Sequence, residues 1–279
     1  MDKHITRFAP SPTGLLHLGH ARSALVGWRA AQQSGGRFLL RIEDIDVGRC
    51  REEFVAAIFE DLAWLGLQWE QPVRRQSRHF ADYSDALDCL TEQGVLYPCF
   101  CTRADIAAAS SAPHGPDGPL YPGTCRPLSD AERLGRIASG EAYALRLDVG
   151  KALAMTGSLT WHDDEAGDVA ADPLSLGDVV LARKDVPTSY HLAVTVDDHL
   201  QGVTLVTRGL DLFHATHIHR LLQALLGYAV PRYRHHALIV DTQGRRLAKR
   251  DKSLTLRALR EAGHMPDQLR AGAMAERVG

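Results

Sequence analysis

Apolar positions in the first part of the chain alternate between helical spacing and short continuous runs. Residues 37–42 form a short apolar run, which predicts a buried strand that ends in the carboxylates of Glu43 and Asp46. Helical spacing occurs on either side of this run, at Leu18, Ala21, Leu25 and Trp28, and at Phe54, Ile58, Leu62 and Leu65. With a strand-like start before the loop that leads to the first helix, the resulting order of strand, helix, strand and helix is typical of a parallel doubly wound α/β sheet.

The middle of the chain differs in character. Helical spacing over residues 80–90 is followed by residues 104–127, which are rich in Ala, Ser, Pro and Gly and predict a mobile excursion. Alternating apolar positions from Tyr143 to Val149 predict a strand. We therefore expect an α/β insertion that divides the first sheet.

Apolar runs after this insertion indicate that the sheet resumes. They predict strands at residues 190–196, 203–208 and 237–240, and Asp211 is a suitable N-cap for a helix that ends at Gly227. The tail from Leu254 has helical spacing. The predicted organisation is a split, Rossmann-like parallel sheet with an inserted domain and a short helical tail, with boundaries at residues 1–70, 71–185, 186–240 and 241–279.

Composition narrows the class of protein. The chain has 279 residues, a hydrophobic fraction of 45%, and a net charge of −2, so it lacks the overall positive charge of a protein that binds nucleic acid non-specifically. The chain starts without an apolar leader and contains no apolar run near ~18 residues, so we expect a cytoplasmic, monomeric protein with no membrane partner. A nucleic-acid partner would therefore have to be bound by local basic patches, and the two candidates are residues 74–79 and 245–252; for the first patch alone, a solvated face is the better interpretation.

Residues 7–22 carry the strongest candidate chemistry. Two prolines and Gly14 delay the start of a helix and deliver His17, Gly19 and His20 to its N-terminus. Backbone N–H groups, the positive end of the helix dipole and two imidazoles are suited to bind phosphate. The segment therefore predicts a nucleotide site without the Walker lysine pattern.

The same segment resembles a known family. His17-Leu-Gly-His20 is similar to the HIGH signature of class I aminoacyl-tRNA synthetases, and Arg7-Phe-Ala-Pro-Ser-Pro-Thr-Gly14 is similar to the form found in glutamyl-tRNA synthetases. The resemblance implies that His17, Gly19 and His20 bind ATP together with Mg²⁺ and that the two histidines are catalytic.

A second block resembles the KMSKS loop of the same class. It is Arg246-Leu-Ala-Lys249-Arg250, in which Lys249 matches the second lysine and is expected to bind ATP and to stabilise charge as pyrophosphate leaves. Arg246, Ala248 and Arg250 depart from the pattern, and loss of the serine hydroxyls leaves fewer contacts.

The resemblance also implies a pocket for glutamate. Glu43 is expected to accept the α-ammonium group, while Arg7 and Arg208 clamp the side-chain carboxylate, for which guanidinium groups offer bidentate, charge-assisted bonds. The remaining residues of the expected pocket are Phe8, Ala9, Pro10, Ser11 and Tyr190. A structural ion pair between Arg7 and Glu43 is the alternative interpretation.

Cysteine spacing predicts a structural zinc site. Cys99, Cys101 and Cys125 supply three thiolates, and Zn²⁺ in a closed site takes four ligands. Chemistry alone favours His114 as the fourth ligand, whereas the resemblance implies Tyr121. The alternative is three unconnected cysteines, and Cys50 and Cys89 are not expected to bind metal.

A histidine cluster near residues 214–219 carries a weaker signal. Its members, His214, His217 and His219, have helical spacing but no neighbouring cysteine or carboxylate, so we expect partly exposed helix residues.

The expected acceptor follows from the length of the chain. Glutamyl-tRNA synthetases continue into helical domains that bind tRNA, whereas about thirty residues follow Lys249 here. This length resembles the shorter family of glutamyl-queuosine tRNA(Asp) synthetases. That resemblance implies activation of L-glutamate by ATP without tRNA, and transfer to queuosine in the anticodon loop of tRNA(Asp). Alternatives are a synthetase that charges a tRNA 3′ end, a non-enzymatic paralogue that acts as a binding module, and a different nucleotidylyltransferase.

Overall fold

A parallel sheet forms the N-terminal part of the computed structural model, which describes residues 3–108, 114–115, 118–183, 185–239 and 255–274. Its strands are β1 (Ile5–Phe8), β2 (Arg37–Ile42) and β3 (Glu70–Arg75), in the order β1–β2–β3. Helices α1 (Leu18–Ser34) and α2 (Glu52–Trp64) connect them. The predicted alternation of strands and helices in this part of the chain is confirmed.

A second sheet lies beside the first. Its order is β11–β12–β8–β9, formed by β11 (Leu205–Gly209), β12 (Arg232–His236), β8 (Thr160–Asp163) and β9 (Gly167–Ala170). The β11–β12 and β12–β8 pairs are parallel, and the β8–β9 pair is antiparallel. Thr204 donates a backbone hydrogen bond to the Ile5 carbonyl at 2.9 Å, which joins the two sheets next to β1. The strand order therefore reverses between β1 and β11, and such a switch point opens a ligand crevice at the carboxyl ends of the strands.

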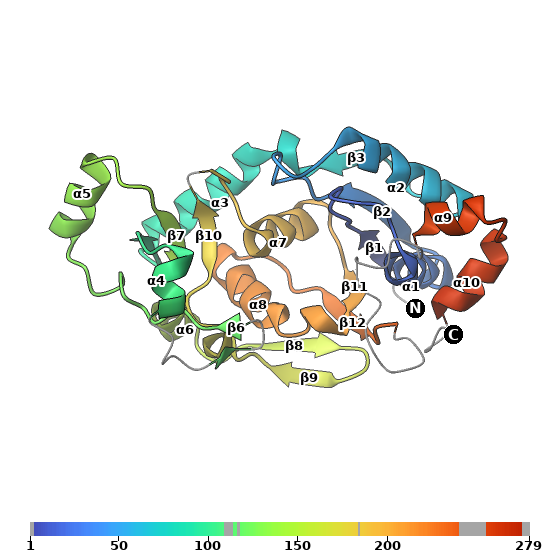
Figure 1. Ribbon diagram of the computed structural model, residues 1–279. Coiled ribbons are helices and arrows are strands. Elements are labelled where there is room, and N and C mark those ends of the chain that lie inside the picture. Colours follow the sequence, from blue (N-terminus) through green and yellow to red (C-terminus); the bar gives the residue numbers. More distant parts are fainter. Residues whose placement is uncertain (1–2, 109–113, 116–117, 184, 240–254, 275–279) are drawn as a thin grey trace.

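The remaining elements extend the molecule in two directions (Figure 1). A third, antiparallel sheet has the order β10–β7–β4. Its region contains η1 (Gln76–Arg78), α3 (Phe80–Glu92), β4 (Leu96–Cys99), α4 (Arg103–Ala108), β5 (His114–Gly115), β6 (Gly118–Pro119), α5 (Asp130–Ala138), β7 (Ala144–Leu147), α6 (Val149–Thr156), η2 (Pro173–Leu176) and β10 (Val180–Arg183). Helices α7 (Tyr190–Leu200) and α8 (Ala215–Leu226) lie between this sheet and β11, with η3 (Leu210–Leu212) before α8. The tail consists of α9 (Leu256–Glu261) and α10 (Pro266–Met274), at the opposite end from α5.

Two main hydrophobic cores support these layers. One packs α1 and α2 against the first sheet and the tail, and includes Leu25, Ile58 and Leu256. The other joins α3, α6, α7 and α8, and includes Leu147 and Leu222. The crevice at the switch point lies between the elements that these two cores hold in place. Within the described residues, none of the helices has the length and apolar character needed to cross a membrane.

The predicted strand at residues 190–196 is wrong, because this segment is helix α7. Ser189 caps the helix through its hydroxyl, which accepts from the Leu192 N–H. Every residue from Leu192 to Asp198 is buried, so the apolar run has no solvent face to reveal a helical period. A short, fully buried apolar run does not distinguish a helix from a strand.

Two further predictions near the second sheet are wrong. Among the described residues the last strand is β12, whose alternating buried residues Tyr233 and His235 precede residues 237–239, which form no strand; residue 240 of the prediction lies outside the described residues. Asp211 lies within η3, and α8 begins later with His214 at the N-cap position. Polar side chains hide strand β12 from a search for apolar runs, because one of its buried positions is a histidine.

The histidines of α8 are more buried than predicted. His217 and His219 are only 6% and 3% exposed, whereas His214 is exposed. His217 accepts from the Asp172 N–H, and His219 contacts Arg208 and His191. Their polar partners lie on elements distant in sequence, so spacing alone could not indicate this burial.

The basic segment at residues 74–79 is not simply a solvated face. Arg74 pairs with Asp197 at 2.6 Å, and Arg75 pairs with Asp44 at 3.2 Å. These arginines therefore link β3 to neighbouring elements. The second basic segment, residues 245–252, lies outside the described residues.

The segment predicted to be a mobile excursion contains helix α4 and the short β5–β6 pair. Its residues 109–113 and 116–117 lie outside the described residues. The strand predicted from Tyr143 is confirmed as β7, although Asp148 caps a new helix and places Val149 in α6.

Candidate active site

A cavity of about 490 Å³ opens at the switch point between β1 and β11. All the described residues predicted to bind glutamate or ATP line it: Arg7, Phe8, Ala9, Pro10, Ser11, His17, Gly19, His20, Glu43, Tyr190 and Arg208. They come from β1, the following loop, α1, the end of β2, α7 and β11. The fold thus brings residues 200 positions apart in sequence to one cavity.

The H-x-G-H segment forms the start of α1 as predicted. His17 is the N-cap, its Nδ1 accepts from the Gly19 N–H at 3.1 Å, and His20 Nδ1 accepts from the His17 N–H at 3.2 Å. Since Nδ1 is the acceptor in each ring, a neutral imidazole carries its proton on Nε2. A Cβ atom at Gly19 would lie 2.9 Å from the His17 ring, so any other residue there would displace this ring from its capping position.

Lys249 lies outside the described residues, but the residues that flank its segment are placed. Leu238 and Ile239, just before the segment, line the cavity. Thr255, just after it, forms a β-bridge with His17, and Leu256 donates to the Leu16 carbonyl at 2.8 Å. Both flanks therefore lie beside the H-x-G-H segment or the cavity.

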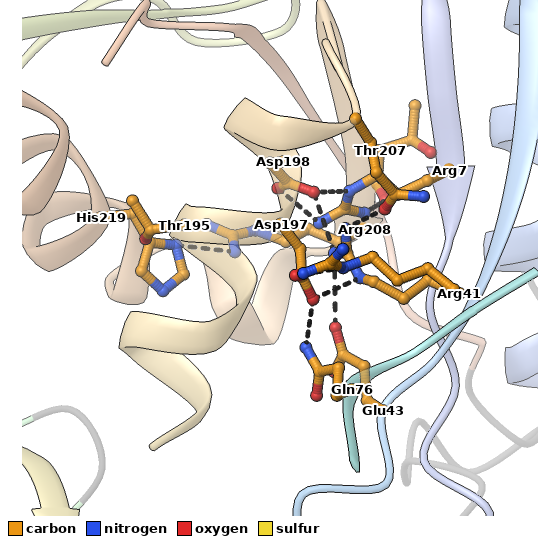
Figure 2. Close-up of polar contacts among 12 residues, drawn as sticks. Arg7, Arg41, Glu43, Gln76, Thr195, Asp197, Asp198, Thr207, Arg208 and His219 are labelled. Carbon is orange, nitrogen blue, oxygen red and sulfur yellow. Dashed lines mark hydrogen bonds and ion pairs between the residues drawn. The ribbon is translucent and has the colours of Figure 1, made fainter. Parts of the chain in front are cut away.

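Arg7 forms an ion pair at the cavity wall (Figure 2). Its Nε and Nη2 donate to the two carboxylate oxygens of Asp198 at 2.9 and 3.2 Å. Arg41, which is fully buried, also donates to Asp198 at 2.9 Å. Although burial opposes ionisation of Asp198, these two guanidiniums hold the pKa of its carboxyl below the usual range.

Glu43 does not take part in the ion pair between Arg7 and Asp198. Its nearest cationic contact is Arg41 Nη2 at 3.5 Å, and it forms no ion pair with Arg7 among the described residues, so the alternative of an Arg7–Glu43 bridge is wrong. Burial raises the pKa of the Glu43 carboxyl to about 7, even though Arg41 and Arg7 favour its charged form. Of the carboxylates after β2, Asp44 accepts from Ser77 and Asp46 pairs with Arg49, which leaves Glu43 as the one that lines the cavity in the described structure.

Arg208 has a different environment. It is 5% exposed, and its acceptors are Tyr190 Oη, His219 Nδ1, His235 Nε2 and Thr216 Oγ1. Among the described residues, no carboxylate lies within ion-pairing distance of its guanidinium. A buried cation with only neutral partners is costly, and a carboxylate ligand entering the cavity would provide the missing charge.

Several residues of this site were missed by the sequence reasoning. Asp198, Arg41 and Asp197 form a buried charge network behind the cavity, and His219, His235 and Thr216 surround Arg208. Asp197 and Asp198, which directly follow the apolar run 190–196, were a sequence signal for this network. Carboxylates next to a buried run are rarely buried without charged partners, so they indicate that arginines or lysines lie nearby.

The three predicted cysteine ligands lie together in a separate small core. The Sγ atoms of Cys99, Cys101 and Cys125 all lie within 4.8 Å of one another, and the group could hold a metal ion. Phe100 donates its N–H to Cys125 Sγ at 3.4 Å, which is a contact that favours a thiolate. Three converging thiols fit the soft ligand set of a structural zinc site.

Tyr121 is positioned beside these thiols. Its Oη lies 3.8 Å from Cys101 Sγ and accepts from the Cys125 N–H at 2.8 Å. The Arg146 guanidinium lies 3.9 Å from the centre of its ring. The side chain of His114, the other candidate, lies outside the described part of the structure.

The fold and the cavity define a class of protein. A parallel α/β sheet carries an H-x-G-H helix start at its switch point, next to a pocket that presents a buried arginine whose partners among the described residues are neutral. This is the catalytic architecture of a class I aminoacyl-tRNA synthetase.

Comparison with known proteins gives the family. The model of the family described as tRNA synthetases class I (E and Q), catalytic domain, matches residues 3–276. The chain therefore belongs to this family.

Individual relatives agree with this assignment. The chain is 48% identical to a glutamyl-Q tRNA(Asp) synthetase of Rhodobacter capsulatus, over 95% of this chain and 98% of that protein. It is 37% identical to a glutamate–tRNA ligase of Aquifex aeolicus, over 96% of this chain and 56% of that protein. A solved glutamate–tRNA ligase of Elizabethkingia meningosepticum in complex with its amino acid superposes with a TM-score of 0.76 at 28% identity, over 90% of this chain and 52% of that chain. The chain thus spans about half the length of the glutamate–tRNA ligases that it matches.

Proposed function

We propose that this chain activates L-glutamate with ATP and transfers the glutamyl group to queuosine in the anticodon loop of tRNA(Asp). The observation that carries the proposal is Arg208, a buried guanidinium that faces the cavity with neutral partners alone among the described residues. A side-chain carboxylate supplies the counter-charge that the protein withholds, whereas an amide does not.

The glutamate is held from both ends. The ionised carboxylate of Glu43 accepts hydrogen bonds from the α-ammonium group of the substrate. Arg208, with Tyr190 beside it, binds the side-chain carboxylate of the substrate. Arg7, oriented by Asp198, and Ser11 line the same cavity. Two fixed charges of opposite sign thus orient the α-carboxylate toward the nucleotide.

ATP occupies the side of the cavity formed by the start of α1. His17 and His20 donate from Nε2 to its phosphates, and Mg²⁺ accompanies the nucleotide. Lys249 stabilises the departing pyrophosphate, a role supported by the position of both flanks of its segment beside the cavity and His17.

The chemistry proceeds in two steps. The glutamate α-carboxylate attacks the α-phosphate of ATP, which forms glutamyl-adenylate and releases pyrophosphate. A hydroxyl group of the queuosine cyclopentenediol then attacks the activated carbonyl, forms an ester, and releases AMP and a proton. The first step needs no tRNA.

The choice of acceptor is supported by the extent of the matches. The relative with 98% of its length covered carries the name glutamyl-Q tRNA(Asp) synthetase, whereas the glutamate–tRNA ligase of Aquifex aeolicus is covered over 56%.

The cysteine cluster is the candidate metal site of the described chain. For this site we propose a structural Zn²⁺ ion bound by Cys99, Cys101, Tyr121 and Cys125.

Two assays test the function. Glutamate-dependent exchange of pyrophosphate into ATP, measured without tRNA, is expected for the unmutated chain, and Lys249→Ala is expected to depress it by roughly 10²-fold with the fold intact. Acylation of tRNA(Asp) is expected only when the tRNA contains queuosine.

The outcomes separate the alternatives. Exchange that requires tRNA, or acylation of a tRNA(Glu) 3′ end, would support a tRNA-charging enzyme instead. Absence of exchange in the unmutated protein would support a non-enzymatic paralogue. Exchange with a different acid in place of glutamate would indicate another nucleotidylyltransferase.

A further inference from the structure

The surroundings of Arg208 extend to a carboxylate that never touches it. Asp163 is 1% exposed and lies at the end of β8, on the far side of His235 from Arg208. Its Oδ2 lies 2.7 Å from His235 Nδ1, and Arg208 Nε donates to His235 Nε2 at 3.1 Å. One imidazole thus separates a buried carboxylate from a buried guanidinium.

The hydrogen bonds fix the tautomer of His235. An ionised carboxylate only accepts, so Nδ1 of His235 must carry the proton and Nε2 must present its lone pair to Arg208. Asp163 is itself held in place, because its Oδ1 accepts from the Glu165 and Ala166 N–H groups, both at 3.0 Å. His235 lies among aromatic rings, with Trp161, Phe213 and Tyr233 at 5.8, 5.1 and 6.0 Å between ring centres.

A second histidine, His219, also accepts a hydrogen bond from Arg208 through an unprotonated ring nitrogen. His219 Nδ1 accepts from Arg208 at 3.1 Å, so a neutral His219 carries its proton on Nε2 and donates it to His191 Nδ1 at 3.2 Å. Burial, followed by the charge of Arg208, lowers the pKa of His235 to about 4, and the same two causes hold the pKa of His219 well below its usual range. The imidazoles around Arg208 therefore remain neutral acceptors near neutral pH.

This arrangement orients a cation without neutralising it. A carboxylate in direct contact with Arg208 would satisfy the guanidinium and compete with an anionic ligand for it. An imidazole spacer fixes the position of the guanidinium through a hydrogen bond and keeps the carboxylate charge one ring away. This is the logic by which a second carboxylate orients a functional histidine in other sites.

We propose that Asp163 and His235 are positioning residues that fix Arg208 and reserve its charge for a side-chain carboxylate, and thereby set the preference for glutamate over glutamine. This inference rests on the proposed function, since Arg208 must face the substrate. It also gives the β8–β9 hairpin a role in specificity, because the pairing of β8 with β12 at Asp163 and Tyr233 places Asp163 beside His235.

Asp163→Asn is the decisive variant. Both carboxylate oxygens of Asp163 are used, because Oδ1 accepts from the Glu165 and Ala166 N–H groups and Oδ2 accepts from the backbone N–H of His235 at 3.2 Å and from its Nδ1. An amide nitrogen at the Oδ2 position faces His235 Nδ1 and forces the proton of His235 to Nε2, against the Arg208 N–H. An amide nitrogen at the Oδ1 position opposes two backbone donors and displaces the side chain that orients His235. We expect KM for glutamate in pyrophosphate exchange to rise roughly tenfold or more, kcat to change less than about threefold, and the ratio of kcat/KM for glutamate over glutamine to fall about tenfold.

The neighbouring aspartate provides a matched control. Asp164 lies in the same turn but pairs with Arg232 and Arg234, both at 2.6 Å, away from the lining of the cavity. Asp164→Asn is expected to leave both KM values and the glutamate preference within about twofold of the unmutated protein. KM for ATP, measured in every variant, should not change.

A second pair of variants keeps the test decisive if Asp163→Asn does not fold. His235→Gln retains an acceptor oxygen for Arg208, whereas His235→Leu removes it, so glutamine at this position should recover part of the glutamate preference that leucine loses. Equal preference in these two variants would overturn the inference. So would an Asp163→Asn protein that behaves like Asp164→Asn, or one that loses thermal stability, kcat and ATP affinity together, since that pattern marks a purely structural role.

Failure of the proposed function would be visible separately. If the unmutated protein supports no exchange, the proposed activity fails, and calorimetric binding of L-glutamate and L-glutamine to the unmutated and Asp163→Asn proteins then decides the inference alone. Weaker glutamate binding with unchanged glutamine binding in the variant would support it, and equal effects on both ligands would overturn it.

Discussion

Two arginines in one cavity differ in how their charge is compensated. Arg7, at the end of β1, and Arg208, at the end of β11, are 4% and 5% exposed. Arg7 forms a two-point ion pair with Asp198, whereas the partners of Arg208 in the described structure are neutral. Burial and residue type are therefore the same, but one side chain belongs to a fixed charge network, whereas the neutral surroundings of the other suit the ligand-binding role proposed for it.

The difference between Arg7 and Arg208 indicates that charges on one side of the cavity stabilise the fold, whereas the charge on the other side is available to a ligand. Asp198 also binds Arg41, so the β1 side of the cavity has a self-contained network of charges. The β11 side instead has an arginine surrounded by hydroxyl and imidazole acceptors. Removing charge from the first side should harm the fold, and removing it from the second should harm binding.

Replacing Arg208 is expected to have the largest effect on activity. Arg208→Met should lower kcat/KM for glutamate in pyrophosphate exchange by about 10³-fold, since a buried charge pair with the substrate is lost. The free energy of unfolding should fall less than in Asp198→Asn, because removal of a buried cation with only neutral partners offsets the loss of its hydrogen bonds to those acceptors. Urea denaturation checks the second part, and a strongly destabilised variant would contradict the contrast with Arg7.

Replacing Asp198 should show the opposite pattern. Asp198→Asn leaves Arg7 and Arg41 facing a neutral amide, and loss of one partner from a buried pair typically costs about 3 kcal/mol or more of unfolding free energy. Asp185→Asn is the control, because its carboxylate is 75% exposed and its pairing with Arg183 should contribute little. Equal stability of these two variants would show that the network on the β1 side is not structural.

Replacing Glu43 tests whether this proposed binding residue lowers the free energy of unfolding of the protein. Its pKa is raised from 4.5 to about 7, so folding favours the protonated form, and the stability that it contributes is present below pH 4.5 and lost as the pH rises to about 7. Glu43→Gln should therefore be more stable than the unmutated protein at pH 8, on the order of 3 kcal/mol, with little difference at pH 4.5. Exchange activity should fall in the same variant, and unfolding at the two pH values measures the stability difference.

The same carboxyl predicts a pH dependence of substrate binding. In its proposed role Glu43 accepts the α-ammonium group only when ionised, so KM for glutamate should rise as the pH falls below about 7, approaching tenfold per unit. KM for ATP serves as the internal reference. A KM for glutamate that stays constant between pH 5.5 and 8 would remove Glu43 from its proposed role.

Changes to the cysteine cluster should have the smallest effect on glutamate binding. Its thiols belong to a core separate from the cavity, so a chelator or Cys125→Ser should lower the unfolding temperature and leave KM for glutamate within about twofold. The chelator should have no further effect on the Cys125→Ser protein. Metal analysis of Tyr121→Phe tests the fourth ligand, since full retention of zinc there would exclude the phenol.

Local patterns in the sequence were sufficient for the elements with a solvent-exposed face. Helices α1 and α2 have a buried stripe and a polar face, so their period is visible, and the capping geometry of His17 and His20 depends on adjacent residues alone. The convergence of Arg7, Glu43 and Arg208 on one cavity was expected only through the resemblance to a family. Helix α7 was misread because it is buried on all sides, and β12 because it buries a histidine.

The sequence by itself determined which charged residues this protein has and where its first sheet and its H-x-G-H turn begin. Those properties depend on short-range periodicity, capping and backbone restriction. Only the tertiary structure decided which charges neutralise each other, because Asp198 meets Arg7 and Asp163 meets His235 across separations of 191 and 72 residues. The free energy of a buried charge depends on its partners in space, and for Arg7 and Arg208 those partners lie on elements that local patterns do not connect.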